Sequence, residues 1–298
     1  MTFRIDHRRA VWMMVAAATM WSIAGVVTRQ LEVARGFEVT FWRSAFNALA
    51  LVGLLSWLRG PGELWRSIAG GGRALWLSGV CWCVMFTAFM LAITLTTVAN
   101  VLITLAVGPL FTSLAARVVL GHRLAPRTWM AILLAGIGIA WMYGREVSGA
   151  EPRHVMGTLI ALAVPVAAAV NWTLLQYLRT RAEPAGDMLP AVLIGALLSS
   201  AITLPLSVPF GASGADVGWL ALLGVVQLAI PCLIAVAASK VLPAPEISLM
   251  ALLEVVLGVL WAWLGAGEAP SVAVLGGGAL VLGALVFNEV LALREPAR

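Results

Sequence analysis

Ten long apolar runs, separated by short polar segments, organise this chain. Each run has roughly 20 residues, which as a helix rising about 1.5 Å per residue spans a hydrocarbon core of about 30 Å. Because a backbone in lipid must form its own hydrogen bonds, we expect every run to be a transmembrane helix. The runs cover residues 10–27, 39–58, 74–95, 98–119, 128–143, 156–178, 188–208, 217–236, 245–264 and 272–293.

The polar segment 144–155 divides the runs into two halves, residues 1–146 and 147–298, with five runs each. An odd number of crossings in the first half turns the second half upside down relative to it. The pattern therefore predicts an all-α integral membrane protein with ten transmembrane helices arranged as two inverted five-helix repeats. Two other separators, 95–97 and 240–244, are so short that each predicts a tight helical hairpin.

Basic residues are distributed unevenly between the two ends of the predicted helices. Of the 19 Lys and Arg residues, only Arg29, Arg35, Arg145 and Arg153 lie at the ends opposite the termini, while Arg43 lies inside a run. Membrane proteins keep loops rich in Lys and Arg in the cytoplasm. We therefore expect a multi-pass protein of the cell inner membrane with both termini in the cytoplasm, at what is called below the inner end.

Composition excludes an ordinary soluble protein, since 61% of the 298 residues are hydrophobic and 11% are charged. The net charge of +5 lies in short loops, so it indicates topology and gives no reason to expect nucleic acid as a partner. Cys81, Cys83 and Cys232 all lie in apolar runs, where small core residues are a better interpretation than a disulfide framework or a zinc site. We expect no metal and no cofactor.

The two halves share a faint internal similarity. Aligning the turn glycines Gly121 and Gly267 brings the Gly-rich runs that follow them into register and places Gly108 opposite Glu254. Few identities survive, so hydropathy and glycine placement carry the proposed repeat.

Glu254 is the most deeply placed acidic residue, about ten residues from either end of its run. Such a group should face protein or a water-filled cavity, because exposure to lipid costs several kcal/mol. Two roles stay open. A protonated Glu254 would hydrogen-bond between helices, whereas a charged Glu254 in a wet cavity would pair with a substrate ammonium group or carry a proton.

A set of residues recurs here in a characteristic order: Trp21, the sequence Phe41-Trp42-Arg43, Gly108-Pro109, Glu254, and the turns at Gly121 and Gly267-Glu268. With these residues the chain resembles the EamA-type drug/metabolite transporter superfamily over nearly its whole length. Two positions depart from the family pattern, since an acid is usual where His122 stands and proline where Val255 stands.

The resemblance implies a secondary transporter that moves a small molecule by alternating access. It also implies that the first four helices of each half line the path, with the fifth and tenth spans as scaffold. Within the superfamily the chain is most similar to bacterial exporters of aromatic and related amino acids. A drug/metabolite or nucleotide-sugar permease of the same superfamily remains the alternative.

Secondary transporters bind their cargo near the midplane, so polar and aromatic residues at the centres of spans are the candidate site. Aromatic residues on one helix face are more often explained by packing than by ligand binding, and amides there can simply join helices. Pro165 and Pro231 are candidate hinges, because proline removes a backbone donor. We expect a small-molecule substrate, the lipid bilayer as surroundings, and a monomer. The candidate substrate-binding residues are Trp21, Ser22, Arg43, Asn47, Ser78, Trp82, Met85, Phe89, Asn100, Asn171, Trp172 and Gln227.

An enzyme and a passive channel are the rival classes. The string from Gly211 to Gly214 imitates an intramembrane serine protease motif, but His7, His122 and His154 all lie outside the spans, so Ser213 is better explained as a turn residue. No charged ring or carbonyl filter favours a channel.

Eight tryptophans near the span ends predict interface belts, namely Trp12, Trp57, Trp65, Trp76, Trp129, Trp141, Trp219 and Trp263.

Overall fold

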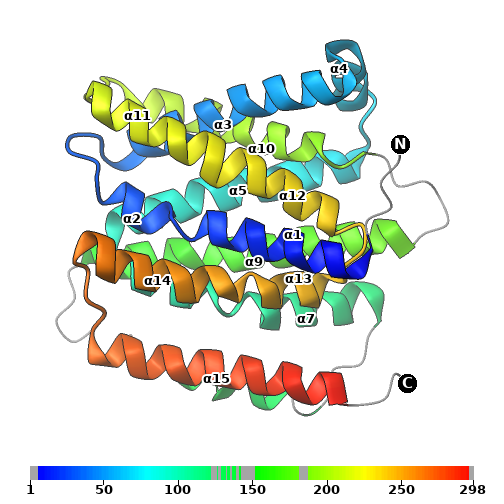
Figure 1. Ribbon diagram of the computed structural model, residues 1–298, viewed down its shortest axis with the longest axis vertical. Helices are drawn as coiled ribbons and strands as arrows, with labels where there is room; N and C mark the ends of the chain where they lie inside the picture. Colours follow the sequence, from blue (N-terminus) through cyan, green and yellow to red (C-terminus); the bar gives the residue numbers. More distant parts are fainter. Residues whose placement is uncertain are drawn as a thin grey trace.

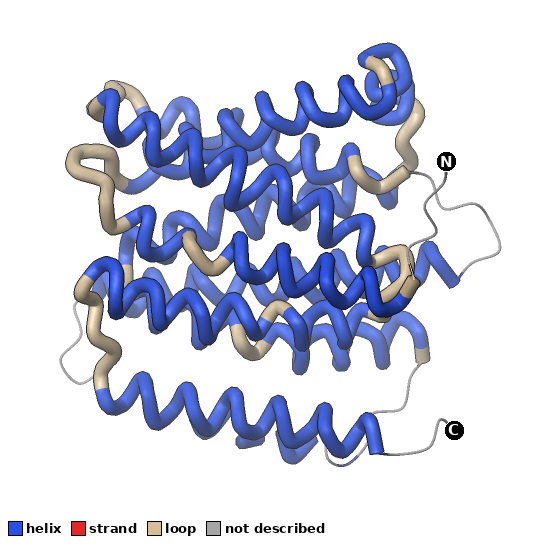
Figure 2. Tube along the Cα trace, viewed as in Figure 1, coloured by secondary structure: helices blue, strands red, loops and turns tan. Residues whose placement is uncertain are grey.

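Helices form all the regular structure in the part of the chain that the computed structural model describes (Figures 1 and 2). That part comprises residues 6–121, 126, 129–131, 133–134, 136–138, 141, 152–180 and 187–294. Eight of its helical segments are long and apolar enough to cross a membrane, and they coincide with predicted spans one to four and six to nine. Apolar helical segments also occur where spans five and ten are predicted, at Trp129–Gly138 and within α15 (Val272–Arg294).

The helices lie side by side as rods of similar direction, and the start of α1 and the end of α15 are on the same side of the molecule (Figure 1). The described elements are α1 (His7–Trp21), α2 (Ala24–Thr28), α3 (Gly36–Arg59), α4 (Pro61–Ala69), α5 (Arg73–Leu95), α6 (Val98–Leu105), α7 (Gly108–Leu120), α9 (Pro152–Thr180), α10 (Pro190–Ser207), α11 (Gly214–Leu222), the π-helix η1 (Leu223–Ala229), α12 (Ile230–Ala238), α13 (Ala244–Met250), α14 (Leu252–Ala266) and α15 (Val272–Arg294).

Four predicted spans are not single regular helices, contrary to expectation. The first is broken between α1 and α2, the fourth between α6 and α7, and the ninth at Ala251 between α13 and α14, while the eighth contains η1. Pro109 explains the second break, because it cannot donate the α-helical hydrogen bond to Leu105. Pro165, by contrast, lies inside α9, which runs through it as one helix.

The helix α4 was not predicted. Pro61 starts it at a position where a missing N–H costs nothing, and the left-handed Gly60 before it (φ 84°) turns the chain out of α3. Only Leu64 is buried, while Trp65 is 70% exposed. A short amphipathic helix with an exposed tryptophan at the end of a span is typical of the membrane interface.

Several helices begin at a capping residue, whose side chain accepts a hydrogen bond from a backbone N–H in the first turn. The Asp6 carboxylate accepts the Arg9 N–H at 2.8 Å, and the Thr97 hydroxyl accepts the Asn100 N–H at 3.2 Å. Ser213 forms a capping box with Asp216 at the start of α11. This capping role agrees with the interpretation of Ser213 as a turn residue, and His154 contacts the Thr96 hydroxyl instead.

Two buried carboxylates hold the loops at the outer end. Asp216 is fully buried and accepts the backbone N–H groups of Glu32, Val33 and Ala34 at 2.8, 3.0 and 2.9 Å. Glu38 accepts two more N–H groups from the loop before α11, at 2.9 and 2.8 Å. Charge-assisted bonds to backbone donors therefore join the α2–α3 loop to the α10–α11 loop.

The outer helical hairpin between α5 and α6 is tied by Arg29 and Glu268. Arg29 Nε lies 2.8 Å from a Glu268 oxygen, and its other nitrogens donate to the Ile93 and Thr96 carbonyls at the end of α5. The second Glu268 oxygen accepts the Val98 N–H at 2.6 Å, at the start of α6. One ion pair thus satisfies backbone groups on both sides of the turn.

The inner hairpin between α12 and α13 is tied in a similar way. Arg179 donates to the carbonyls of Val241 and Leu242, and the Gln176 side chain accepts the Ala244 N–H at 2.9 Å. Under the alignment that matches Gly121 with Gly267, Val98 corresponds to Ala244. In each hairpin, therefore, an arginine donates hydrogen bonds to carbonyls before the second helix. A side-chain oxygen accepts the backbone N–H of the first residue of that second helix.

The two turn glycines that the proposed repeat aligns also have the same backbone conformation. Gly121 ends α7 and Gly267 ends α14, both with left-handed φ angles, +72° and +67°, that a side chain would strain. His122 and most of the segment 144–155 lie outside the described residues. The boundary between residues 146 and 147 therefore stays a prediction.

All three cysteines are buried free thiols, in keeping with their predicted core positions. The eight tryptophans assigned to span ends are all exposed, with Trp57 at 82% and Trp219 at 38%. Their position on the outside of the bundle is the one an interface belt requires.

Candidate functional site

A cavity lies at the centre of the bundle, where both halves of the chain meet. The space between its lining atoms, counted with its opening to solvent, is about 840 Å³. Its lining residues are Trp21, Arg43, Trp82, Met85, Phe86, Phe89, Leu105, Gly108, Val164, Pro165, Ala168, Trp172, Gln227, Leu228, Cys232, Ser248, Ala251, Leu252, Glu254 and Val255.

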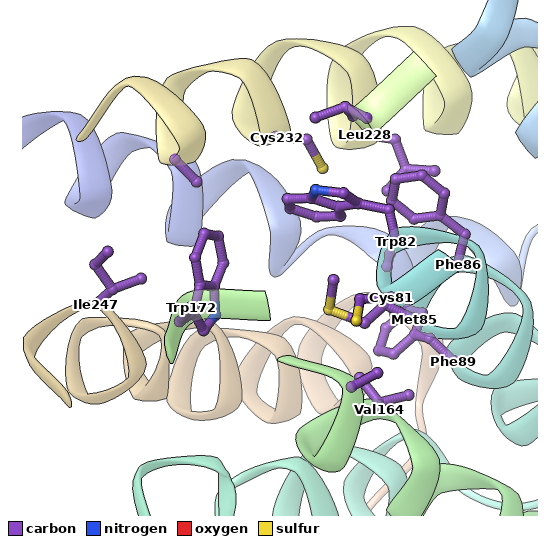
Figure 3. Close-up of a cluster of buried hydrophobic side chains, with 14 of the residues drawn as sticks. Cys81, Trp82, Met85, Phe86, Phe89, Val164, Trp172, Leu228, Cys232 and Ile247 are labelled. Carbon is purple, nitrogen blue, oxygen red and sulfur yellow. The ribbon is translucent and has the colours of Figure 1, made fainter. Parts of the chain in front are cut away.

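Aromatic rings form one wall of the cavity. The Trp82 ring lies 5.5 Å from the Phe86 ring and 5.7 Å from the Trp172 ring, which meets it edge to face. Figure 3 shows Trp82 and Phe86 of α5 in the same interior region as Leu228 and Cys232 of η1 and α12. The Trp82 indole N–H is buried without a hydrogen-bond acceptor among the described residues. The wall therefore offers a polar donor as well as flat apolar surfaces.

Arg43 places a cationic side chain on the cavity wall although it is only 1% exposed. Its Nε and Nη2 atoms donate to the Gln227 Oε1 atom at 3.2 and 2.8 Å, and Nη1 makes a longer bond of 3.5 Å to the Phe86 carbonyl. The guanidinium also lies over the Phe89 ring, 5.5 Å from its centroid. All these partners are neutral, so the positive charge is solvated but not neutralised.

Glu254 lines the same cavity from α14. Neither Glu254 nor Arg43 takes part in any of the ion pairs found among the described residues. The cavity thus contains a carboxyl group and a guanidinium with no ion pair between them. An uncompensated buried charge costs several kcal/mol, so Arg43 favours a ligand that carries a negative charge.

The interruptions in the helices converge on this cavity. Trp21 ends α1, Gly108 starts α7 and Ala251 separates α13 from α14, and all three line the space. Gln227 and Leu228 add the π-helical turn of η1. Broken helices at membrane depth are tolerated where they line a cavity, and transporters build their binding sites from them.

Most of the predicted aromatic and charged site residues are brought together at the cavity. Trp21, Arg43, Trp82, Met85, Phe89, Trp172, Gln227 and Glu254 line it, as does the candidate hinge Pro165.

The remaining candidates lie elsewhere in the bundle. Ser22 accepts the Trp261 indole N–H at 3.1 Å, and Ser78 donates to Asn171 at 2.6 Å between α5 and α9. Asn47, Asn100, Asn171 and Ser22 are each at most 2% exposed and are absent from the lining, as is Pro231. Ser22, Ser78 and Asn171 thus join helices through hydrogen bonds. Both polar atoms of the Asn47 amide are buried without a hydrogen-bond partner among the described residues.

Sequence reasoning missed the apolar part of the lining and one hydroxyl. Phe86, Leu228 and Leu252 look like ordinary core residues in the sequence, and no pattern separates them from their neighbours. Ser248 is different, because it lies in the Glu254 span and hydrogen-bonds Thr112 of α7 at 2.7 Å. A search for every hydroxyl in the central spans would have found it.

The first half of the chain is similar to a known protein family. Residues 8–144 match the EamA-like transporter family. This EamA-like part contributes Trp21, Arg43 and Trp82 to the cavity, while Gln227 and Glu254 come from beyond it. An uncharacterized transporter of Vibrio cholerae is 26% identical over 140 residues, and the aligned part is 45% of this chain and 45% of that relative.

A solved crystal structure of a protein has the same fold over nearly the whole chain. It superposes on 97% of this chain and 99% of its own with a TM-score of 0.66, at 20% identity. The likeness extends beyond the EamA-like part through α9 to α15. At this identity it shows the fold and nothing of the cargo.

Proposed function

We propose that this protein is a secondary transporter that exports small amphipathic metabolites, specifically amino acids with aromatic or other apolar side chains, by alternating access through the central cavity. One observation carries the proposal: Arg43 and Glu254 face one aromatic-walled cavity without an ion pair between them. The EamA-like first half supports a transporter. The resemblance of the sequence to YddG, a bacterial exporter of aromatic amino acids, supports the cargo.

A zwitterion satisfies both charges at once. Its carboxylate pairs with Arg43 and its ammonium group with Glu254, while its apolar side chain lies against Trp82 and Trp172. The contact between Arg43 and Phe89 offsets about 2 kcal/mol, less than the several kcal/mol that an unpaired buried charge costs. Binding of a carboxylate at Arg43 is therefore favourable.

The proposal includes the arrangement of the protein in the membrane. Ten transmembrane helices form two inverted halves, 1–146 and 147–298, in a monomer of the cell inner membrane with cytoplasmic termini. The similar ties at the two helical hairpins and the paired left-handed glycines support the repeat. The paucity of basic residues at the outer end supports the orientation.

Counterflow in proteoliposomes tests the function directly. Vesicles loaded with unlabelled phenylalanine should accumulate labelled phenylalanine transiently, because an alternating-access transporter exchanges cargo across the membrane. A panel of amino acids, nucleotide sugars and cationic drugs then assigns the substrate class. Accumulation driven by nucleotide sugars or drugs, with none driven by amino acids, contradicts the proposed cargo, and a passive channel gives no counterflow at all.

A further inference from the structure

Gln227 has bonds at both ends of its side-chain amide, which fixes its orientation. Its Oε1 atom accepts two N–H groups from Arg43, and its Nε2 atom donates to the Trp21 carbonyl at 3.2 Å. A flipped amide would lose all three contacts and place Nε2 against a guanidinium, donor against donor. The oxygen is therefore held toward Arg43.

The acceptor at Trp21 is available because of the helix break there. Trp21 is the last residue of α1, so its carbonyl lies where the helical hydrogen-bond pattern ends before α2. Gln227 thus joins the broken first span to the guanidinium on α3.

The local sequence explains how Gln227 reaches Arg43. A Cβ atom at Gly224 would lie 2.6 Å from the Arg43 carbonyl oxygen and 2.8 Å from the Asn47 nitrogen, so η1 approaches the α3 backbone as only glycine permits. Pro231, four residues after Gln227, has no N–H for the Gln227 carbonyl. The π-helical turn of η1 lies where this helical hydrogen bond is missing, and such turns are frequent at functional sites.

We propose that Gln227 is a positioning residue that makes the cavity selective for a carboxylate, because its neutral amide holds the Arg43 guanidinium in place without neutralising it. Three N–H groups of Arg43 have acceptors, so further N–H groups are free to bind an anion. A carboxylate at position 227 would hold the guanidinium equally well but would neutralise it. The inference rests on the proposed function and specifies how its site distinguishes amino acids from amines.

The test compares phenylalanine with phenylethylamine, which lacks only the carboxylate, in proteoliposomes containing the full chain. For Gln227→Glu, the half-saturating concentration of phenylalanine should rise about tenfold or more, since a tenfold change corresponds to about 1.4 kcal/mol of lost pairing. That of phenylethylamine should change less than twofold or fall. Loss of the bond to Trp21 affects both compounds alike, so their ratio reports on Arg43.

Gln176→Glu is the matched control. Gln176 is also a buried glutamine that accepts through Oε1, but its partner is the Ala244 N–H at the inner hairpin. This variant should leave the ratio between the two compounds unchanged.

A second variant keeps the test decisive if Gln227→Glu does not fold. Gln227→Met removes the acceptor without adding charge, and its effect on the ratio should disappear in an Arg43→Gln background, because Gln227 acts through Arg43. Equal changes for both compounds, or an undiminished effect without Arg43, would overturn the positioning role. No phenylalanine counterflow by the wild-type protein would instead overturn the proposed function, and the inference with it.

Discussion

Trp82 is the side chain through which the cavity should discriminate cargo by size. Replacing Trp82 by alanine removes its contacts with Phe86 and Trp172 and the surface against which a large side chain packs. A lost aromatic contact is worth about 1 kcal/mol, so the half-saturating concentration of phenylalanine should rise about fivefold while that of alanine changes little. Competition by both amino acids against one labelled substrate measures this difference.

Trp76 provides the control on the same helix. It belongs to α5 but is 46% exposed and does not line the cavity. Trp76→Ala should affect both substrates equally. If Trp82→Ala also weakens both equally, Trp82 is a packing residue and the proposed wall is wrong.

Glu254 should be needed for zwitterionic cargo. Glu254→Gln keeps the size of the side chain but removes the charge that pairs with a substrate ammonium group, so phenylalanine transport should be lost at unchanged thermal stability. Glu246→Gln is the matched change in the same span, at a residue that pairs with His7 at the inner end, and should retain transport. A fully active Glu254→Gln variant would show that Glu254 only joins helices.

At the scale of elements, Asp216 should determine the stability of the outer loops. Its carboxylate receives backbone N–H groups from two loops, and asparagine would turn an NH₂ donor toward some of those donors. Asp216→Asn should lower the free energy of unfolding by about 2 kcal/mol. Thermal unfolding in detergent measures this loss.

Glu32 is the comparison for that change. Its backbone N–H binds Asp216 but its own side chain is exposed, so Glu32→Gln should leave the melting temperature unchanged. Equal melting temperatures for Asp216→Asn and the wild type would mean that the buried carboxylate does not hold the loops.

At the scale of the whole molecule, the two hairpin ties should act as opposite gates. Arg29 closes the outer hairpin and Arg179 the inner one, and the native Cys232 lines the cavity between them. With Cys81 and Cys83 replaced by alanine, Arg29→Gln should increase labelling of Cys232 by an impermeant thiol reagent from outside. Arg179→Gln should increase it only from the inner side.

Each arginine variant is the control for the other. Both remove a guanidinium that binds carbonyls at the end of a helix, so general loosening would increase labelling from both sides in both variants. That result would contradict a gating role for the ties.

Labelling also tests the orientation of the chain. Single cysteines at Ser148 and Ala297, in a protein without other cysteines, should react from opposite sides of the membrane, with Ser148 accessible in intact cells. The reason is the scarcity of Lys and Arg at the outer end. Equal labelling of both positions by an impermeant reagent would contradict the predicted topology.

The sequence alone located eight membrane-spanning segments, their approximate ends and several of the residues most suited to chemistry. In a membrane a backbone must satisfy its hydrogen bonds locally, so hydropathy along the chain is enough to locate the spans. Arg43 and Glu254 could be found for a related reason, because charges are too costly in lipid to be there without a partner or a cavity. The role of Ser213 at a turn could also be predicted from the sequence, because its hydroxyl accepts the N–H of Asp216, only three positions away.

The tertiary structure alone decided which side chains share the cavity and which carboxylates hold the loops. Phe86 and Leu228 line the cavity because of how α5 and η1 are rotated against their neighbours, and rotation depends on packing that one helix does not encode. Gln227, the side-chain acceptor for Arg43, and Asp216, the acceptor for the Val33 N–H, both lie more than 180 positions away from their donors. Ala251 interrupts the ninth span without any glycine or proline at the break, so only packing between helices locates that interruption.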